Sequence, residues 1–396
     1  MKKKIKDLAV FGGTPLFDKT LHVGTPNTGS REKLFARIED LLERNWLTNR
    51  GPYVKEFEEK VAQMVGIKHC IAMANGTIAL EIAIRALGMT GEVIVPSFTF
   101  IATAHALQWQ GIKPVFCDID AAAHNIDPAA VEALITPRTT GIIGTHVWGR
   151  PCHIENLTRI AGKHNLKLLF DAAHAFACSY KGRMIGRFGD AEVFSFHATK
   201  FFNTFEGGAV VTDNDELAEK IRLMKNFGFA GVDKVIYIGT NGKMNEVSAA
   251  MGLTSFESMA EFIEANRNNY LYYKEKLMPI PGIEIAPYNE KEKCNYQYVV
   301  LEIDASTFGV SRDELVKIFS AENIRARRYF YPGCHLMEPY ATLDRGSMPK
   351  LPRTDVLCER VLTLPTGRTI DKTDIDKIAA LFMFVHNKSN EIKEKT

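Results

Sequence analysis

Residues 167–171 read KLLFD and residues 191–200 read AEVFSFHATK, so two apolar runs each lead to an ionisable side chain. Both runs have the length and the apolar content of buried strands. Asp171 ends the first run and is followed by Ala172-Ala173-His174, whereas Lys200 lies just beyond the second run. Ligands of α/β sheets collect at the carboxyl ends of the strands. The two runs therefore predict an acid and a lysine amine at one edge of a sheet.

An acid and a lysine in this layout are typical of a site for pyridoxal 5'-phosphate. The amine of Lys200 can form a Schiff base with the cofactor aldehyde, and the freed amine can then act as the catalytic base. The carboxylate of Asp171 can keep the pyridine nitrogen protonated, so that the ring accepts electrons. Each residue alone has an ordinary explanation, because Lys200 could be a surface lysine and Asp171 a loop or helix cap.

Short apolar runs alternate with helix-like stretches between about residues 68 and 212. Strand-like runs also lie at residues 70–74, 92–96, 114–117 and 141–144, and helix-like stretches at 77–87 and 100–110. Continuous apolar strands in such an alternation predict an α/β fold, with a mostly parallel central sheet and helices on both faces.

The length of 396 residues favours two domains. We expect a large domain at residues 20–265 and a smaller α+β domain at residues 266–396, with residues 1–19 packed against the smaller one. A long or kinked helix from Asn245 to about Met278 would connect them, and residues 324–330 resemble a strand of the smaller domain.

Composition excludes several classes of function. The formal net charge is +2, too close to neutrality to indicate nucleic acid or membrane partners. The sequence shows no apolar run of membrane-spanning length, and Lys2-Lys3-Lys4 is not followed by the long apolar segment of a secretory signal. The seven cysteines form no C-x-x-C pair and no zinc-type spacing. They predict buried free thiols, no metal site and a cytoplasmic location.

The segment from Phe194 to Lys200, followed by EGGAVVT at residues 206–212, resembles the cofactor-lysine segment of the DegT/DnrJ/StrS family. Members of that family are fold-type I aminotransferases that use pyridoxal 5'-phosphate and act on nucleotide-linked keto sugars. The resemblance runs from about Trp46 into the C-terminal third, with several motifs in the same order. It implies the fold-type I architecture and the pyridoxal 5'-phosphate cofactor, with a pyridoxamine 5'-phosphate intermediate.

The resemblance also implies a phosphate site. In Asn75-Gly76-Thr77, which lies between a predicted strand and helix, the backbone N–H groups and the Thr77 hydroxyl can bind phosphate. The family usually has serine at the position of Asn75, but Gly76 and Thr77 keep the donors. Ser195 would add a hydroxyl. Without the resemblance, the tripeptide would be an ordinary helix cap and Ser195 a strand serine.

Three further residues receive roles in the same way. Phe100 matches the aromatic residue that stacks on the pyridine ring, although a core phenylalanine is the plain alternative. His174 matches the Gln or His near the cofactor's phenolic oxygen, and a core histidine is equally compatible. Asn241 matches the asparagine that reaches the phosphate of the neighbouring subunit, although Asn-Gly is also a turn signal. The Asn241 match implies a homodimer with shared active sites.

The implied reaction transfers an amino group from L-glutamate to a nucleoside-diphosphate keto sugar, leaving 2-oxoglutarate. Residues 46–49, 197–208 and 239–244 look closest to the branch that converts dTDP-4-keto-6-deoxyglucose to dTDP-4-amino-4,6-dideoxyglucose for O-antigen or antibiotic sugars. Open alternatives are C3 amination of a 3-keto sugar and C4 amination of a GDP- or UDP-sugar. A sugar dehydratase of this fold has histidine in place of Lys200, and a regulator on a degenerate scaffold would lack Lys200 or Asp171.

Two other segments have weaker signals. Residues 46–52 resemble the loop that borders the sugar pocket. Arginines and aromatic residues around Pro332-Gly333, including Arg327 and Arg328, could meet diphosphate, base or the carboxylate of glutamate, or could form a solvated face.

Overall fold

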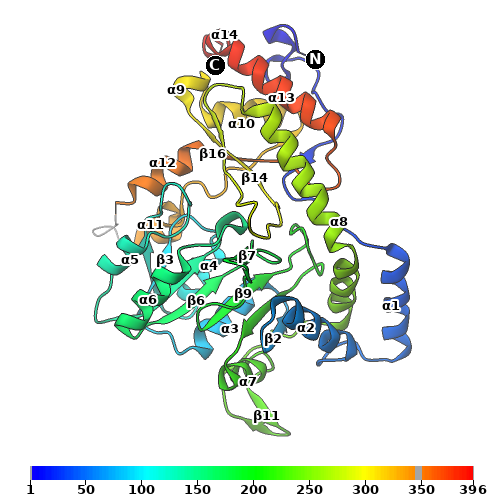
Figure 1. The fold of residues 1–396 in the computed structure, drawn as a ribbon, viewed down its shortest axis with the longest axis vertical. Helices are drawn as coiled ribbons and strands as arrows, with labels where there is room; N and C mark the ends of the chain where they lie inside the picture. The colour runs from blue at the N-terminus through cyan, green and yellow to red at the C-terminus, as the bar shows by residue number, and fades with distance from the viewer. Residues whose placement is uncertain (1, 344–349, 396) are drawn as a thin grey trace.

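A seven-stranded sheet forms the centre of the large N-terminal part in the computed structural model, which describes residues 2–343 and 350–395 (Figure 1). Its spatial order is β2 (His69–Met73), β10 (Gly208–Thr212), β9 (Ala191–Ser195), β6 (Lys167–Asp171), β5 (Thr139–Thr145), β3 (Glu92–Pro96) and β4 (Lys113–Cys117). Strand β10 is antiparallel to both neighbours, and the other adjacent pairs are parallel. The predicted mostly parallel sheet is confirmed.

Helices cover both faces of this sheet, because alternate strand residues point in opposite directions. Leu168 and Phe170 of β6 pack in one apolar cluster with α2 (Pro52–Val65), α6 (Ile154–His164) and the start of α8 (Glu246–Leu277). Leu169 packs in the opposite cluster, with α3 (Gly76–Ala86), α4 (Ala102–Gln108) and α7 (Asp215–Met224). The predicted layers are therefore confirmed as well.

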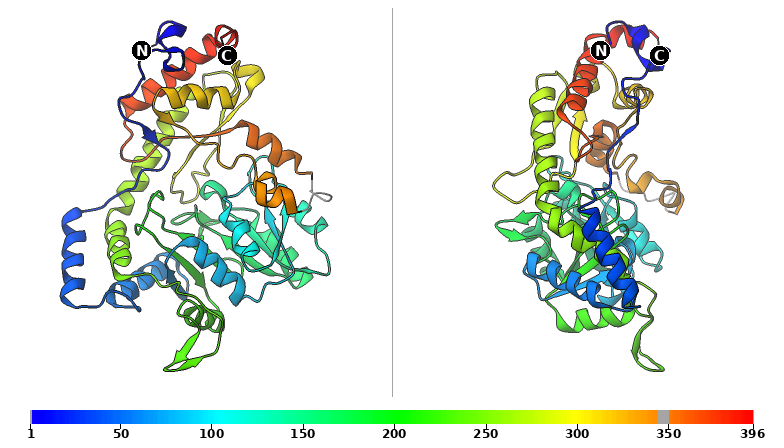
Figure 2. Two further views of the ribbon diagram at one scale, coloured as in Figure 1. Left: turned by 180° about the vertical axis from the view of Figure 1, so that it is seen from behind. Right: turned by 90° about the vertical axis from the view of Figure 1, so that its right-hand side faces the viewer.

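A separate apolar cluster organises the C-terminal part. It contains residues of α10 (Arg312–Ala321), α13 (Lys372–Asn387) and the three-stranded sheet β13 (Ile283–Ile285), β14 (Val299–Ile303) and β16 (Val361–Leu364). Ile5, Leu8 and Phe17 belong to the same cluster, so the two termini lie side by side (Figure 1 and Figure 2).

Helix α8 runs without interruption between the two parts, with Phe262 in one cluster and Tyr270 in the other. Because residues of this one helix belong to both apolar clusters, the domain boundary between residues 265 and 266 stays a prediction. Residues 1, 344–349 and 396 of the predicted division lie outside the described residues.

The remaining elements are short or peripheral. They are η1 (Ile5–Asp7), η2 (Ala9–Phe11), β1 (Leu21–His22), α1 (Arg31–Glu43), α5 (Pro128–Ala133), η3 (Val147–Gly149), β7 (Ser179–Tyr180), β8 (Arg183–Met184), β11 (Phe229–Gly231), β12 (Lys234–Val235), α9 (Ala305–Phe308), β15 (Ile324–Arg325), η4 (Cys334–Leu336), α11 (Glu338–Leu343), α12 (Pro352–Arg360) and α14 (Ser389–Lys393). Among the described residues, neither the long α8 nor any other helix has an apolar stretch sufficient to cross a bilayer.

Two expectations about the C-terminal part were wrong. The predicted strand at 324–330 is limited to β15, which pairs with the distant β1; the chain then leaves the pairing and buries Phe330 against Phe98 and Trp148. Cys294 is half-buried rather than buried, whereas the other six cysteines are buried free thiols as expected.

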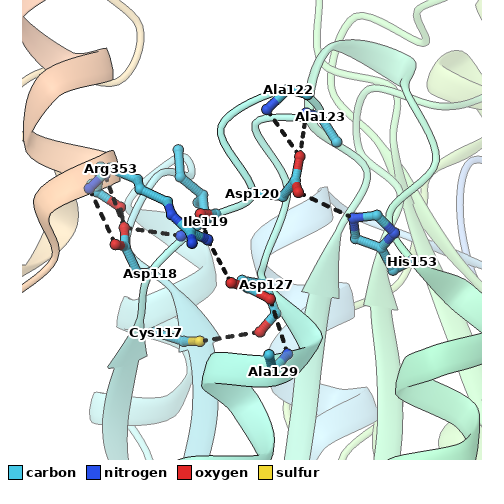
Figure 3. Close-up of polar contacts among 11 residues, drawn as sticks. Cys117, Asp118, Ile119, Asp120, Ala122, Ala123, Asp127, Ala129, His153 and Arg353 are labelled. Carbon is cyan, nitrogen blue, oxygen red and sulfur yellow. Dashed lines mark hydrogen bonds and ion pairs between the residues drawn. The ribbon is translucent and has the colours of Figure 1, made fainter.

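Helix α12 is anchored to the loops beyond β4 (Figure 3). The backbone N–H and the hydroxyl of Thr354 each donate to Asp118 Oδ1 at 2.8 Å. Arg353 Nη1 donates to Asp127 Oδ2 at 2.6 Å, and the other carboxylate oxygen of Asp127 caps α5 through Ala129 N–H. These contacts hold the C-terminal part over one edge of the central sheet.

The start of β10 is packed against the start of α3, which gives a test of the fold. A Cβ on Gly208 would lie 2.6 Å from the carbonyl carbon of Asn75 and 2.7 Å from Gly76 N. We expect Gly208→Ala to lower the free energy of unfolding by about 1–3 kcal/mol in urea denaturation, because the backbone at the start of α3 would have to move away from the added methyl group. Gly162→Ala in α6 is the control, since nothing lies within 4 Å of its Cβ position; it should raise stability by up to about 1 kcal/mol. Equal effects would contradict the close approach.

Candidate active site

Asp171 and Lys200 lie at the same edge of the central sheet. Asp171 ends β6, and Lys200 lies in the bend that follows the adjacent parallel strand β9. No hydrogen bond joins the two side chains in the described residues, but the charge of Asp171 acts on the Lys200 amine. The site therefore starts from an acid and an amine that are electrostatically coupled.

Burial lowers the pKa of Lys200 from its usual 10.5 to about 8, and the negative charge of Asp171 opposes this fall. Desolvation favours the neutral form of an amine, and here it outweighs the effect of the neighbouring carboxylate. A substantial fraction of the amine is consequently unprotonated near pH 8, and the unprotonated form is the nucleophile that a carbonyl group requires.

Asp171 is held by donors on both carboxylate oxygens. Burial raises its pKa, and the hydroxyl of Thr103, the N–H of Ala173 and the charge of Lys200 oppose the rise. Thr103 Oγ1 donates to Oδ2 at 2.8 Å, and Ala173 N donates to Oδ1 at 3.1 Å. The Oγ1 of Thr103 also lies 3.1 Å from the Oγ1 of Thr99, whose hydroxyl donates to Thr145 Oγ1 at 3.3 Å. Sequence reasoning missed Thr103.

The N-terminus of α3 presents free donors next to this pair. Asn75 is the helix cap, and its side chain accepts from Ile78 N–H at 2.9 Å. Within the described residues, the N–H groups of Gly76 and Thr77 and the hydroxyls of Thr77 and Ser195 have no hydrogen-bond partner. A Cβ on Gly76 would lie 3.1 Å from Ser195 Cβ, so these donors are adjacent. Such a donor set at a helix N-terminus fits a phosphate dianion.

His174 is a buried, neutral histidine. Its Nδ1 accepts from Trp148 N–H at 3.3 Å, which leaves Nε2 to donate to Tyr298 Oη at 3.4 Å. Burial lowers its pKa well below the usual value, and the charge of Lys200 adds to this effect. Its ring lies nearly parallel to those of Trp148 and Phe330, at centroid distances of 6.1 and 5.9 Å. Tyr298 and Phe330 were not predicted; their positions depend on contacts with the C-terminal part.

Phe100 and Asn241 lie at the periphery. Phe100 is 55% exposed, and its ring centroid lies 6.5 Å from that of Phe330. Asn241 is exposed and forms a backbone bridge with Asn226; no hydrogen bond joins it to the other predicted site residues in the described part of the chain. The structure thus brings all the predicted residues to one locality except Asn241. No group of three His, Cys, Asp or Glu residues in that part is arranged to hold a metal ion.

A layered α/β sheet with a buried acid, a lysine and an open helix N-terminus at one edge is the architecture of the fold-type I pyridoxal-phosphate transferases. The chain belongs to the DegT/DnrJ/EryC1/StrS aminotransferase family, whose model matches residues 29–383. The family and the enzyme class predicted from the sequence are thereby confirmed.

Named relatives cover nearly the whole chain. A dTDP-4-amino-4,6-dideoxy-D-glucose transaminase from Shigella dysenteriae is 40% identical over 92% of this chain and 98% of its own. One of the same name from Escherichia coli is 35% identical over 92% and 99%. The crystal structure of DesI in the presence of its TDP-sugar product is 47% identical, with a TM-score of 0.95 over 99% of both chains.

The lowered pKa of Lys200 predicts a pH-dependent stability. The unfolded chain keeps the amine protonated up to about pH 10.5, whereas the folded chain releases the proton near pH 8. Between these values the unfolded state binds more protons, so raising the pH favours folding. The test compares the unfolding free energies of the cofactor-free wild type and of Lys200→Met. We expect the wild-type value to gain on that of the variant as the pH rises from 8 to 10. A difference that stays constant over this range would contradict the shift.

Proposed function

We propose that the protein transfers an amino group from L-glutamate to C4 of dTDP-4-keto-6-deoxyglucose. The products would be dTDP-4-amino-4,6-dideoxyglucose and 2-oxoglutarate. The observation that carries the proposal is the juxtaposition of Lys200, Asp171 and the open N-terminus of α3 in a chain of the aminotransferase family. The choice of sugar is supported by the Shigella and Escherichia coli transaminases and by the DesI structure with its TDP-sugar product.

Pyridoxal 5'-phosphate is the proposed cofactor, and it supplies an electron-accepting ring and an aldehyde that carries the amino group. Groups of the site suit its aldehyde, its ring nitrogen and its phosphate. In the proposed assignment the aldehyde meets Lys200, the ring nitrogen Asp171, the ring face Phe100, the phenolic oxygen His174, and the phosphate Gly76, Thr77 and Ser195.

The chain's own residues divide the proton chemistry. Lys200 Nζ, with its pKa near 8, can accept and return a proton at the carbon that bears the transferred nitrogen. Asp171 must stay ionised to hold a proton on the ring nitrogen, and the bond from Thr103 favours that ionised form. His174 carries its hydrogen on Nε2, so its ring is a neutral group of the site.

A homodimer with shared active sites is part of the proposal. The β11–β12 hairpin projects from the body of the molecule, close in sequence to Asn241 (Figure 1). Val232 in its turn is 93% exposed, and Ile238, which follows β12, is 76% exposed. Exposed apolar surface of this kind is typical of protein interfaces. A second copy covering this hairpin would place Asn241 toward the partner's phosphate site.

Absorbance spectroscopy of the purified, cofactor-loaded protein tests the reaction. L-Glutamate should bleach the visible band of the lysine-bound cofactor, and dTDP-4-keto-6-deoxyglucose should restore it; Lys200→Ala should do neither. A wild-type band unaffected by L-glutamate would contradict the donor. If another keto sugar restores the band and dTDP-4-keto-6-deoxyglucose does not, the proposed sugar substrate is wrong.

The substitution Asn241→Asp tests the shared site. It keeps the shape of the side chain but brings a negative charge toward the partner's phosphate, so cofactor affinity should fall about tenfold or more in equilibrium dialysis. Light scattering should show a dimer for both proteins. Unchanged affinity, or a monomer near 44.3 kDa, would exclude a site built from two chains.

A further inference from the structure

Arg327 occupies a fixed backbone position beside the site. It follows β15 and forms an isolated antiparallel bridge with Thr363 of β16. Arg327 N donates to Thr363 O at 3.1 Å, and Thr363 N donates to Arg327 O at 2.8 Å. The hydroxyl of Thr363 donates to the same carbonyl of Arg327 at 3.1 Å. The side chain of Arg327 is exposed, so a rigid backbone presents a long cationic side chain to solvent.

The guanidinium of Arg327 has an aromatic neighbour but no acidic one. Its central carbon lies 4.9 Å from the centroid of the Tyr329 ring. Among the described residues, no carboxylate forms an ion pair with it. Arg328, the next residue, differs: it forms an ion pair with Asp313 at 3.0 Å and lies over the ring of Tyr331 at 4.4 Å. Of these two adjacent arginines, Arg327 is the one whose charge is unmatched.

Tyr329 connects Arg327 to the centre of the site. Its ring lies 6.4 Å from that of Tyr298, whose Oη contacts His174 Nε2 at 3.4 Å. Burial raises the pKa of Tyr329, and the positive charges of Arg327 and Lys200 both oppose the rise. Tyr329 is thus a neighbour that both cations share.

We propose that Arg327 binds a carboxylate of the amino donor. The inference rests on the proposed function and identifies the residue that recognises its first substrate. An amino-acid donor must bring its α-nitrogen to the site of Lys200, and its α-carboxylate is attached to the same carbon. The diphosphate of a nucleotide sugar is attached at C1, across the sugar ring from the reacting C4. The planar guanidinium suits bidentate binding of a carboxylate, and the Tyr329 ring orients that plane.

Single-turnover kinetics of the cofactor-loaded enzyme test this proposal. Arg327→Gln should raise the apparent dissociation constant for L-glutamate about 10- to 100-fold, because a charge-assisted bond is lost. Arg327→Lys should recover part of the loss, since it keeps the charge but not the fork. The dependence of the second half reaction on the keto sugar should change by less than about twofold. Calorimetric binding of glutarate, which carries no amino group, should weaken in parallel.

Arg328→Gln is the matched control, because its charge is already paired with Asp313; it should leave both half reactions unchanged. If the wild type reacts with L-glutamate and Arg327→Gln has the same apparent dissociation constant for it, the assignment of Arg327 is overturned, but the proposed donor is not. A shift confined to the keto sugar would overturn it in favour of the diphosphate. A wild type that does not react with L-glutamate would overturn the proposed donor, and this inference with it.

Discussion

The carboxylate of Asp171, buried at the end of β6, is the group on which the rest of the site depends. A buried carboxylate is unfavourable unless donors and positive charge surround it. Here the donors are the hydroxyl of Thr103 and the N–H of Ala173, and the positive charge is that of Lys200. The same desolvation lowers the pKa of Lys200, so one apolar environment adjusts both the acid and the amine.

The C-terminal part completes the site that the central sheet begins. Ser97, directly after β3, holds the segment at residues 333–335. Its hydroxyl oxygen lies 2.6 Å from His335 Nδ1 and accepts from His335 N at 3.1 Å. Its carbonyl accepts from Cys334 N at 2.9 Å. These bonds, with those between α12 and the loops beyond β4, place Phe330 against Trp148 and His174. The contacts between the central-sheet part and the C-terminal part therefore position the aromatic side chains of the site.

Local sequence patterns were sufficient for the residues that lie at the ends of elements. Asp171 ends an apolar strand, so the strand pattern alone predicts its place at the edge of a parallel sheet. Gly76, Thr77 and Ser195 were assigned to the site through the family resemblance, and they lie at the start of α3 and the end of β9. Thr103 could not be found this way, because its bond to Asp171 spans 68 residues of sequence. The end of β15 after Arg325 reflects pairing with β1, another contact that no local pattern reveals. The role proposed for Asn241 would require a second chain, which no pattern within one chain reveals.

The fate of the transferred nitrogen tests the account most directly. The purified enzyme would be incubated with L-glutamate labelled with nitrogen-15 and with dTDP-4-keto-6-deoxyglucose, and the sugar product examined by nuclear magnetic resonance. The account predicts the label bonded to C4 of a dTDP-4-amino-4,6-dideoxyglucose. A label bonded to C3, or a sugar recovered without label, would contradict it.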